Sequence, residues 1–210
     1  MKKSLLALLF AAALAVPALA ENMWVGGDFS YNSSNSKLEI DGNDADKKSS
    51  TSWSIAPEFG YSLNETWDIG LDFEYASGQN VKEICGIDLD AEGQIDNTEI
   101  GIAPFARYHI AQIAGIDVML KGSIFYVSGE AKGVAKADYT AFGVKIAPVI
   151  SYSINETWSI GATLNFAELS YTNLQIKPKD APIDVKQKSD AFGFNLNDGS
   201  LISIGFSYHF

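Results

Sequence analysis

The chain has 210 residues, of which 47% are hydrophobic, and it carries a formal net charge of −11 with a pI near 4.5. Nucleic-acid binding requires clustered cations that neutralise phosphates, so this acidic balance argues against a nucleic-acid partner. The single cysteine, Cys85, excludes an intramolecular disulfide bond.

The first residues have the pattern of a signal peptide. Two lysines precede an almost wholly apolar run over residues 4–16, and Ala18-Leu19-Ala20 has the small-x-small pattern of a signal-peptidase site. The pattern predicts export with residues 1–20 removed after Ala20 and residues 21–210 as one mature domain. No later segment is apolar over the roughly 20 residues that a membrane helix needs, whereas strands that cross a membrane give a weaker signal.

A repeated motif predicts four related strands. Ile55-Ala56-Pro57-Glu58-Phe59-Gly60-Tyr61 recurs as Ile102–Tyr108 and Ile146–Tyr152, and Ile202–Tyr208 keeps the same spacing. The last copy alternates apolar and small or polar residues without a break, which is typical of a strand with one apolar face.

Partner strands that run the other way complete a set of eight. They cover residues 23–31, 67–75, 116–126 and 158–167. Tight turns are expected at residues 64–66, 112–115 and 155–157, and long polar loops at residues 32–51, 77–97, 128–139 and 172–199. This alternation of short and long connections is the topology of outer-membrane barrels, and closure leaves no unpaired edge.

Aromatic residues gather at both ends of these strands, where amphipathic rings favour a membrane interface. The expected periplasmic girdle comprises Tyr61, Trp67, Tyr108, Tyr152, Trp158 and Tyr208, and the outer girdle Tyr31, Trp53, Tyr75, Tyr126 and Phe142. A strand tilted by about 40° that rises roughly 3.3 Å per residue spans about 20 Å between the girdles, close to the apolar band of about 25 Å in such barrels.

The C-terminal pattern Ser203-x-Gly205-x-x-Tyr208-x-Phe210 resembles the signal by which outer-membrane barrels are recognised for insertion, with Gly205, Tyr208 and Phe210 as its residues. Together with the signal peptide and the repeated strands, it makes the chain similar to the small outer-membrane barrels typified by the OmpA transmembrane domain. Unlike in OmpA, no peptidoglycan-binding domain is expected after the last strand.

This resemblance implies an all-β, eight-stranded, antiparallel up-and-down transmembrane barrel in the outer membrane of a Gram-negative cell. It also implies the partners of such a barrel: outer-membrane lipid and lipopolysaccharide around it, periplasmic chaperones and the barrel-assembly machinery during insertion, and an extracellular partner at its loops.

The strand positions opposite the apolar face would line the lumen and carry charged residues. We expect Glu58, Asp72, Arg107, Lys121 and Lys145 to form a charge network that plugs the barrel. An eight-stranded barrel is only wide enough for side chains to fill, and a lone charge without water is costly. The alternative is a set of separate charges in a water-filled lumen.

Two features leave alternatives open. Pro57, Pro104 and Pro148 lie mid-strand, where each lacks a backbone donor, so either bulges or locally widened pairing is expected there. The segment Asp88-Leu89-Asp90-Ala91-Glu92-Gly93, with Glu99 following, has the ligand spacing of an EF-hand calcium loop. It departs from that loop by its Glu92 and its lack of flanking helices, and solvated acidic residues are the alternative.

The sequence therefore predicts a non-enzymatic barrel without cofactor or metal, whose role is structural or surface-interactive through its long loops. His109 and His209 are the only histidines, and each is expected at the periplasmic end, away from outer-leaflet lipid. A small, low-conductance porin is one alternative, and a soluble periplasmic ligand-binding barrel with its apolar face inward is another.

Overall fold

A computed structural model describes residues 22–40, 43–81, 83–84, 87–88, 95–133, 136–164, 168–179, 187–195 and 202–210. These residues form strands and turns, and they include no helix long and apolar enough to cross a membrane. The predicted signal peptide lies outside the described residues.

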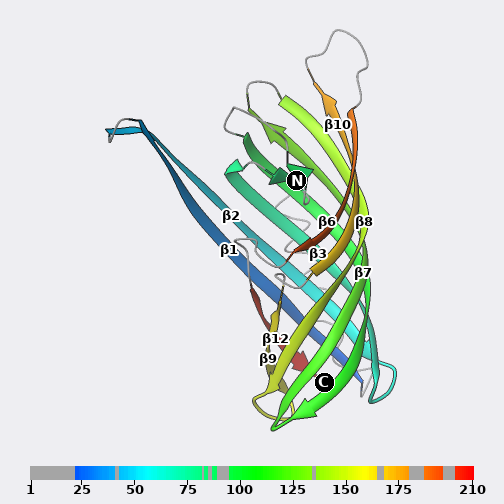
Figure 1. Ribbon diagram of the computed structural model, residues 1–210. Coiled ribbons are helices and arrows are strands. Elements are labelled where there is room, and N and C mark those ends of the chain that lie inside the picture. The colour runs from blue at the N-terminus through cyan, green and yellow to red at the C-terminus, as the bar shows by residue number, and fades with distance from the viewer. Residues whose placement is uncertain are drawn as a thin grey trace.

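Eight strands close into an antiparallel barrel, as predicted (Figure 1). The described residues form twelve strands in all: β1 (Met23–Ile40), β2 (Asn43–Ser62), β3 (Trp67–Val81), β4 (Glu83–Ile84), β5 (Ile87–Asp88), β6 (Ile95–Ile113), β7 (Ile116–Lys132), β8 (Lys136–Ser153), β9 (Trp158–Thr163), β10 (Glu168–Pro178), β11 (Gln187–Asn195) and β12 (Ser203–His209). The closed ring runs β1-β2-β3-β6-β7-β8-β9-β12, and β12 pairs with β1. The two short strands β4 and β5 pair only with each other among the described strands.

The last two predicted strands are each divided in two. The part of β8 nearer the tight turns pairs with β9. The part farther from them pairs with β10, which in turn pairs with β11. Val149 is opposite Thr163, whereas Ile146 is opposite Leu169, so the register of β8 against its partner shifts between them. The prediction of one continuous strand over residues 158–167 was wrong, and β11 falls inside the predicted loop 172–199.

The repeated sequence after the tyrosines builds the same tight turn twice. Asn64 Oδ1 accepts hydrogen bonds from the backbone N–H of Thr66 at 2.8 Å and of Trp67 at 3.0 Å. Asn155 Oδ1 does the same for Thr157 and Trp158 at 2.9 and 2.8 Å. An asparagine carbonyl that caps the next backbone donors stabilises a turn locally, so both predicted turns are confirmed.

The third tight turn has only two residues between β6 and β7. Ala114 has φ of 52° and Gly115 φ of 82°, and two positive φ angles are typical of the type I′ turn that joins tightly twisted hairpins. The start of the first strand, β1, and the end of the last strand, β12, lie at the same end of the barrel as these turns. Ser62 N–H donates to Asn22 O at 2.9 Å and Phe210 N–H donates to Met23 O at 3.1 Å.

Large apolar side chains point outward from the wall. Among the exposed ones are Phe29, Tyr31, Trp53, Ile69, Ile102, Tyr108, Leu120, Ile124, Tyr126, Phe142, Val144, Ile146, Tyr152, Trp158, Ile204 and Phe206. The alternate positions of the same strands are buried in the lumen and include Glu58, Arg107 and Lys121. Period-two alternation therefore separates an apolar outer surface from a charged interior.

The polar segments predicted as long loops are largely strand, so this prediction was wrong. The β1–β2 ladder continues to Ile40 opposite Asn43, and the β7–β8 ladder to Lys132 opposite Lys136. Ladder hydrogen bonds join backbone groups of any residue type. Apolar alternation marks only the part of a strand that needs one apolar face, and it disappears where both faces are polar.

At two of the three mid-strand prolines the pairing with the next strand is interrupted and no bulge forms. Between β2 and β3 the ladder lapses at Pro57 and resumes at Glu58 in the same register, and between β6 and β7 it lapses at Pro104 and resumes at Phe105. The register shift in β8 falls at Pro148. Each proline stays paired with the preceding strand of the ring, opposite Gly27, Leu71 and Leu120 respectively.

The extended strands predict slow amide exchange where a loop would exchange freely. In detergent micelles we expect residues 128–132 and 136–140 to exchange at least roughly 100-fold more slowly than a free peptide, because they form ladder hydrogen bonds. Hydrogen exchange followed by mass spectrometry measures this, with the exposed turn residue Glu65 as the fast control. Equal rates in the two regions would contradict the strand assignment.

Candidate functional site

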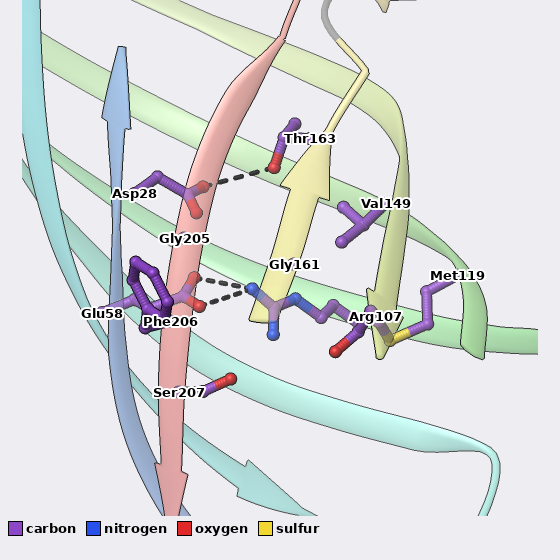
Figure 2. Close-up of a pocket in the computed structure, with 11 residues that line it drawn as sticks. Asp28, Glu58, Arg107, Met119, Val149, Gly161, Thr163, Gly205, Phe206 and Ser207 are labelled. Atoms are coloured by element: carbon purple, nitrogen blue, oxygen red, sulfur yellow. Dashed lines mark hydrogen bonds and ion pairs between the residues drawn. The ribbon is translucent and has the colours of Figure 1, made fainter. Parts of the chain in front are cut away.

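The centre of the lumen is occupied by a buried ion pair between β2 and β6. Arg107 Nη2 donates to both carboxylate oxygens of Glu58, at 2.7 and 2.6 Å, and Figure 2 shows this contact. The two side chains are 9% and 5% exposed, so the pair is almost completely shielded from solvent. Each residue reaches the lumen because it lies on the inward parity of its strand.

A second cation joins the pair from β7. Lys121 Nζ lies 3.1 Å from Glu58 Oε2 and 2.8 Å from Asp72 Oδ2, so it connects β2 with β3. Arg107 is opposite Lys121 in the β6–β7 ladder and opposite Asp68 in the β3–β6 ladder. Four of the five predicted network residues thus meet across the lumen.

Aromatic rings enclose the cations. Arg107 Cζ lies 4.5 Å from the centroid of Trp24, and Lys121 Nζ lies 4.2 Å from the centroid of Phe105. A cation over an aromatic face is attracted by the ring quadrupole, and more strongly where water is excluded. Trp24 is only 2% exposed, because its strand turns it inward against Gly60.

Asp28 adds a third carboxylate beside the network. Thr163 Oγ1 donates to Asp28 Oδ2 at 3.2 Å. A side chain at Gly205 would collide with Asp28 Oδ1 and with the backbone oxygen of Gly27, so only glycine fits opposite Asp28. Gly205, predicted as part of the insertion signal, therefore also makes room for a lumen carboxylate.

The remaining space in this part of the lumen is small. Asp28, Glu58, Arg107, Met119 and Val149 are among the residues that line a cavity of about 20 Å³ (Figure 2). That volume accommodates about one water molecule. This cavity is too small for a solute, which agrees with the predicted plug.

Lys145, the fifth predicted network residue, enters the lumen separately from β8. It lies opposite Ser123 and Ser170 in the ladders and is half-buried. Along β8 it is one inward-facing position farther from the tight turns than Ala147, which lies opposite Lys121. The ion pairs around Glu58 form without it.

The two histidines lie at the end of the lumen with the tight turns. His109 Nε2 is 2.9 Å from Asp68 Oδ2, and His209 Nε2 is 3.3 Å from Ser159 Oγ. The serine and the carboxylate therefore contact different histidines. Alternation along β3 and β1 places Asp68 and Asp28 on the inward face of their strands, and only the register of the ladders shows which partner each one meets.

A second, mainly apolar layer fills the outer part of the lumen. Val127, Tyr139, Ala141 and Leu174 form a buried cluster, and Leu174 is fully buried. Tyr139 Oη donates to Glu99 Oε2 at 2.5 Å. The predicted strands leave this layer out, because Tyr139 and Leu174 fall in predicted loops. Their alternation with polar neighbours is the signal in the sequence that indicates them.

The C-terminal motif forms part of an aromatic cluster at the same end as the turns. Tyr208 packs against Trp158 and against Phe210, with ring centroids 5.0 Å apart in both pairs. Trp67 and Tyr108 repeat this contact at 5.0 Å. These rings belong to the end of the barrel where the periplasmic girdle is predicted.

Most of the calcium-loop segment lies outside the described residues. Asp88 ends β5, residues 89–94 are not described, and Glu99 lies in β6 with its carboxylate bonded to Tyr139. Within the described part of the chain no three acids, histidines or cysteines are grouped closely enough to hold a metal.

The buried ion pair predicts a specific stability pattern. Arg107→Ala leaves Glu58 with one cation and should cost about 3–5 kcal/mol of unfolding free energy, whereas the double variant Glu58→Ala/Arg107→Ala should recover a large part of that loss. Urea unfolding in phospholipid vesicles, followed by tryptophan fluorescence, measures both. Lys132→Ala at the surface is the control, expected within about 0.5 kcal/mol of the parent. Equal losses in the single and double variants would contradict the pairing.

Several solved structures of outer-membrane proteins are similar to this chain, whereas no curated protein sequence matches it. Neisserial surface protein A is 13% identical, with 91% of this chain and 98% of the other covered and a TM-score of 0.46. A major outer membrane protein from Thermus thermophilus is 9% identical, with 88% and 99% covered and a TM-score of 0.44. The attachment invasion locus protein Ail of Yersinia pestis is 9% identical, with 91% and 100% covered and a TM-score of 0.39.

The family assignment comes from the sequence as a whole. Residues 5–210 match the model of the outer membrane protein beta-barrel domain, which is nearly the entire chain. The closed eight-stranded wall, its apolar outer face and its charged lumen agree with that match. The chain therefore belongs to the family of outer membrane protein beta-barrel domains.

Proposed function

We propose that the protein is a closed, non-enzymatic outer-membrane barrel that acts structurally and through hairpins projecting at the cell surface. Family membership supports an outer-membrane location. The outward apolar face supports contact with lipid and disfavours the soluble alternative, in which that face would line a ligand cavity.

The observation that carries the surface role is the projection of the β1–β2 hairpin. Its ladder continues to Ile40 and Asn43, whereas β12 pairs with β1 only as far as Phe29 and β3 pairs with β2 only from Thr51. Figure 1 shows this hairpin extending away from the barrel wall. Its two polar strands extend beyond the aromatic residues Tyr31 and Trp53. A partner at the cell surface would meet this part of the hairpin.

The lumen supports a closed barrel over the porin alternative. The Glu58 network crosses the interior at one level, and the Tyr139 cluster fills it at another. These two layers, one above the other, support a lumen without a wide aqueous path. The contacts of the two histidines, at the opposite end from the projecting hairpin, support a non-enzymatic role.

Closure predicts the absence of large conductance. Purified protein in planar bilayers should give no sustained large conductance steps, because side chains fill the lumen at both levels. A variant with Glu58, Asp72, Arg107 and Lys121 all changed to serine is the matched comparison for the ionic layer. Sustained steps from the parent protein would refute the closed barrel and favour the porin.

The surface role predicts that the hairpin can be removed without loss of the barrel. Replacing residues 35–49 by Asn-Gly joins Ser34 to Ser50, which face each other in the ladder, through a two-residue turn. We expect unchanged heat-modifiable mobility and outer-membrane fractionation, and at least roughly 10-fold weaker binding of cells to host-cell or matrix surfaces to which the parent binds.

The control for this deletion is a variant in which residues 35–49 keep their composition in scrambled order. It retains the charge of the hairpin and changes its sequence, so it separates specific contact from general charge. Undiminished surface binding by the deletion variant would show that the hairpin does not carry the role.

A further inference from the structure

The ionic layer of the lumen contains more acids than bases. Glu58 and Asp72 bind Arg107 and Lys121, so two acids and two bases balance each other. Asp28 lines the same space from β1 and brings a third carboxyl group, as Figure 2 shows. With every group charged, the layer would carry one uncompensated negative charge in a space from which water is largely excluded, and such a charge is costly.

The strands packed around Asp28 do not supply the missing positive charge. Its ladder partners are Ala56 on β2 and Gly205 on β12, and neither is charged. Among the described residues, the charged groups that act on Asp28 are one acid and the two bases of the ionic layer: Glu58, Arg107 and Lys121. Both bases already bind other carboxylates, and the two histidines lie nearer the tight turns, where they contact other groups.

Asp28 receives fewer hydrogen bonds than an ionised carboxylate needs in such a place. Thr163 Oγ1 donates to Oδ2 at 3.2 Å and is the single side-chain donor to Asp28 among the described residues. Oδ1 lies against Gly205, where a Cβ atom would collide with it. A carboxylate that stays charged away from water is normally held by several donors or by a cation. A neutral carboxylic acid needs only one donor and one acceptor.

A cavity beside Asp28 has room for that acceptor. Its volume of about 20 Å³ accommodates about one water molecule. Gly161 and Gly205 lie opposite each other in the ladder and both line the cavity, so the absence of two side chains leaves this space.

A second buried group at the cavity also lacks a partner. Arg107 lines the space with a side chain that is only 9% exposed, and its Nε has no hydrogen-bond partner among the described residues. Figure 2 shows this side chain running across the space to Glu58. The oxygen of one water molecule can accept hydrogen bonds from both Arg107 Nε and a protonated Asp28.

A proton meets the charge deficit better than a metal ion. A buried carboxyl group without a cation is ordinarily neutralised by protonation. A metal ion would need several oxygen ligands beside the guanidinium of Arg107, which repels it. The described part of the chain groups no three acids, histidines or cysteines in a way that could hold one.

We propose that the ionic layer binds one proton, held on Asp28 as a neutral carboxylic acid and shared with a water molecule in the cavity beside Gly161. The proposal rests on the proposed closed barrel and adds the charge state of its plug. The proton comes from solvent during assembly, and an O–H bond forms on Asp28. The unfolded chain gives up this proton more readily than the barrel does, so stability falls as pH rises.

Infrared spectroscopy tests the proton directly, because a neutral carboxylic acid absorbs at a frequency that ionised carboxylates lack. The sample is the full chain in phospholipid vesicles near neutral pH. We expect a carboxylic-acid band in the parent, its loss in Asp28→Asn and its retention in Asp190→Asn, which removes an exposed carboxylate of β11. A parent without the band, a band that survives in Asp28→Asn, or an equal loss in the control would overturn the proposal.

Gly161→Ala tests the water molecule and supplies a second variant if Asp28→Asn does not insert. A Cβ atom there comes no closer than 3.3 Å to its nearest neighbour, Ile150 O, and takes up part of the cavity. We expect the carboxylic-acid band to remain but to shift in frequency, because the acid loses its water partner. A band at the parent frequency would show that Asp28 does not share its proton with water in this cavity.

Urea unfolding measures the linked pH dependence. Between about pH 6 and about pH 9 the midpoint of the parent should fall further than that of Asp28→Asn, which retains the titration of the two histidines. Equal falls would contradict the proton, and a midpoint that rises with sodium concentration instead would indicate a metal cation in its place. Planar-bilayer recordings report separately on the closed barrel, because the lumen can be closed with Asp28 charged, or open with Asp28 neutral.

Discussion

A membrane interior offers no water to unpaired backbone groups, and this constraint determines the architecture of the protein. Strands can satisfy it only by pairing on both sides, so the sheet must close. In a closed sheet each strand has one face toward lipid and one toward the lumen, and the period-two alternation of side chains assigns every residue to one of them. The apolar wall and the charged interior are two results of the same ladder.

Closure also explains why the interior is so fully occupied. The inward positions of eight strands converge on a narrow space, where Glu58 meets two cations and Asp72 meets one. Removing water from a charge is costly unless an opposite charge and hydrogen bonds replace it. The rings of Trp24 and Phe105 further shield the cations. The network therefore follows from barrel width as much as from any particular function.

The sequence was sufficient to predict the wall but not its full extent. The repeat ending at Tyr61, Tyr108 and Tyr152 identified the strands and their tight turns, because the lipid-facing part of a strand must alternate. It could not identify the outer extensions, such as the pairing of Lys132 with Lys136, since polar strands pair through backbone groups that leave no hydrophobic pattern. The alternation of side chains likewise identified Glu58 and Arg107 as lumen residues. Their contact depends on the register between neighbouring strands, which alternation within one strand does not define.

The prolines have a mechanical consequence. The interruptions at Pro57 and Pro104, and the register shift at Pro148, all fall between strands that a tight turn connects. The long hairpins β1–β2 and β7–β8 keep unbroken ladders through the wall. The barrel is thus divided into stiff hairpins joined along weaker seams, and a force pulling on one end of the chain would separate it at those seams, one long hairpin at a time.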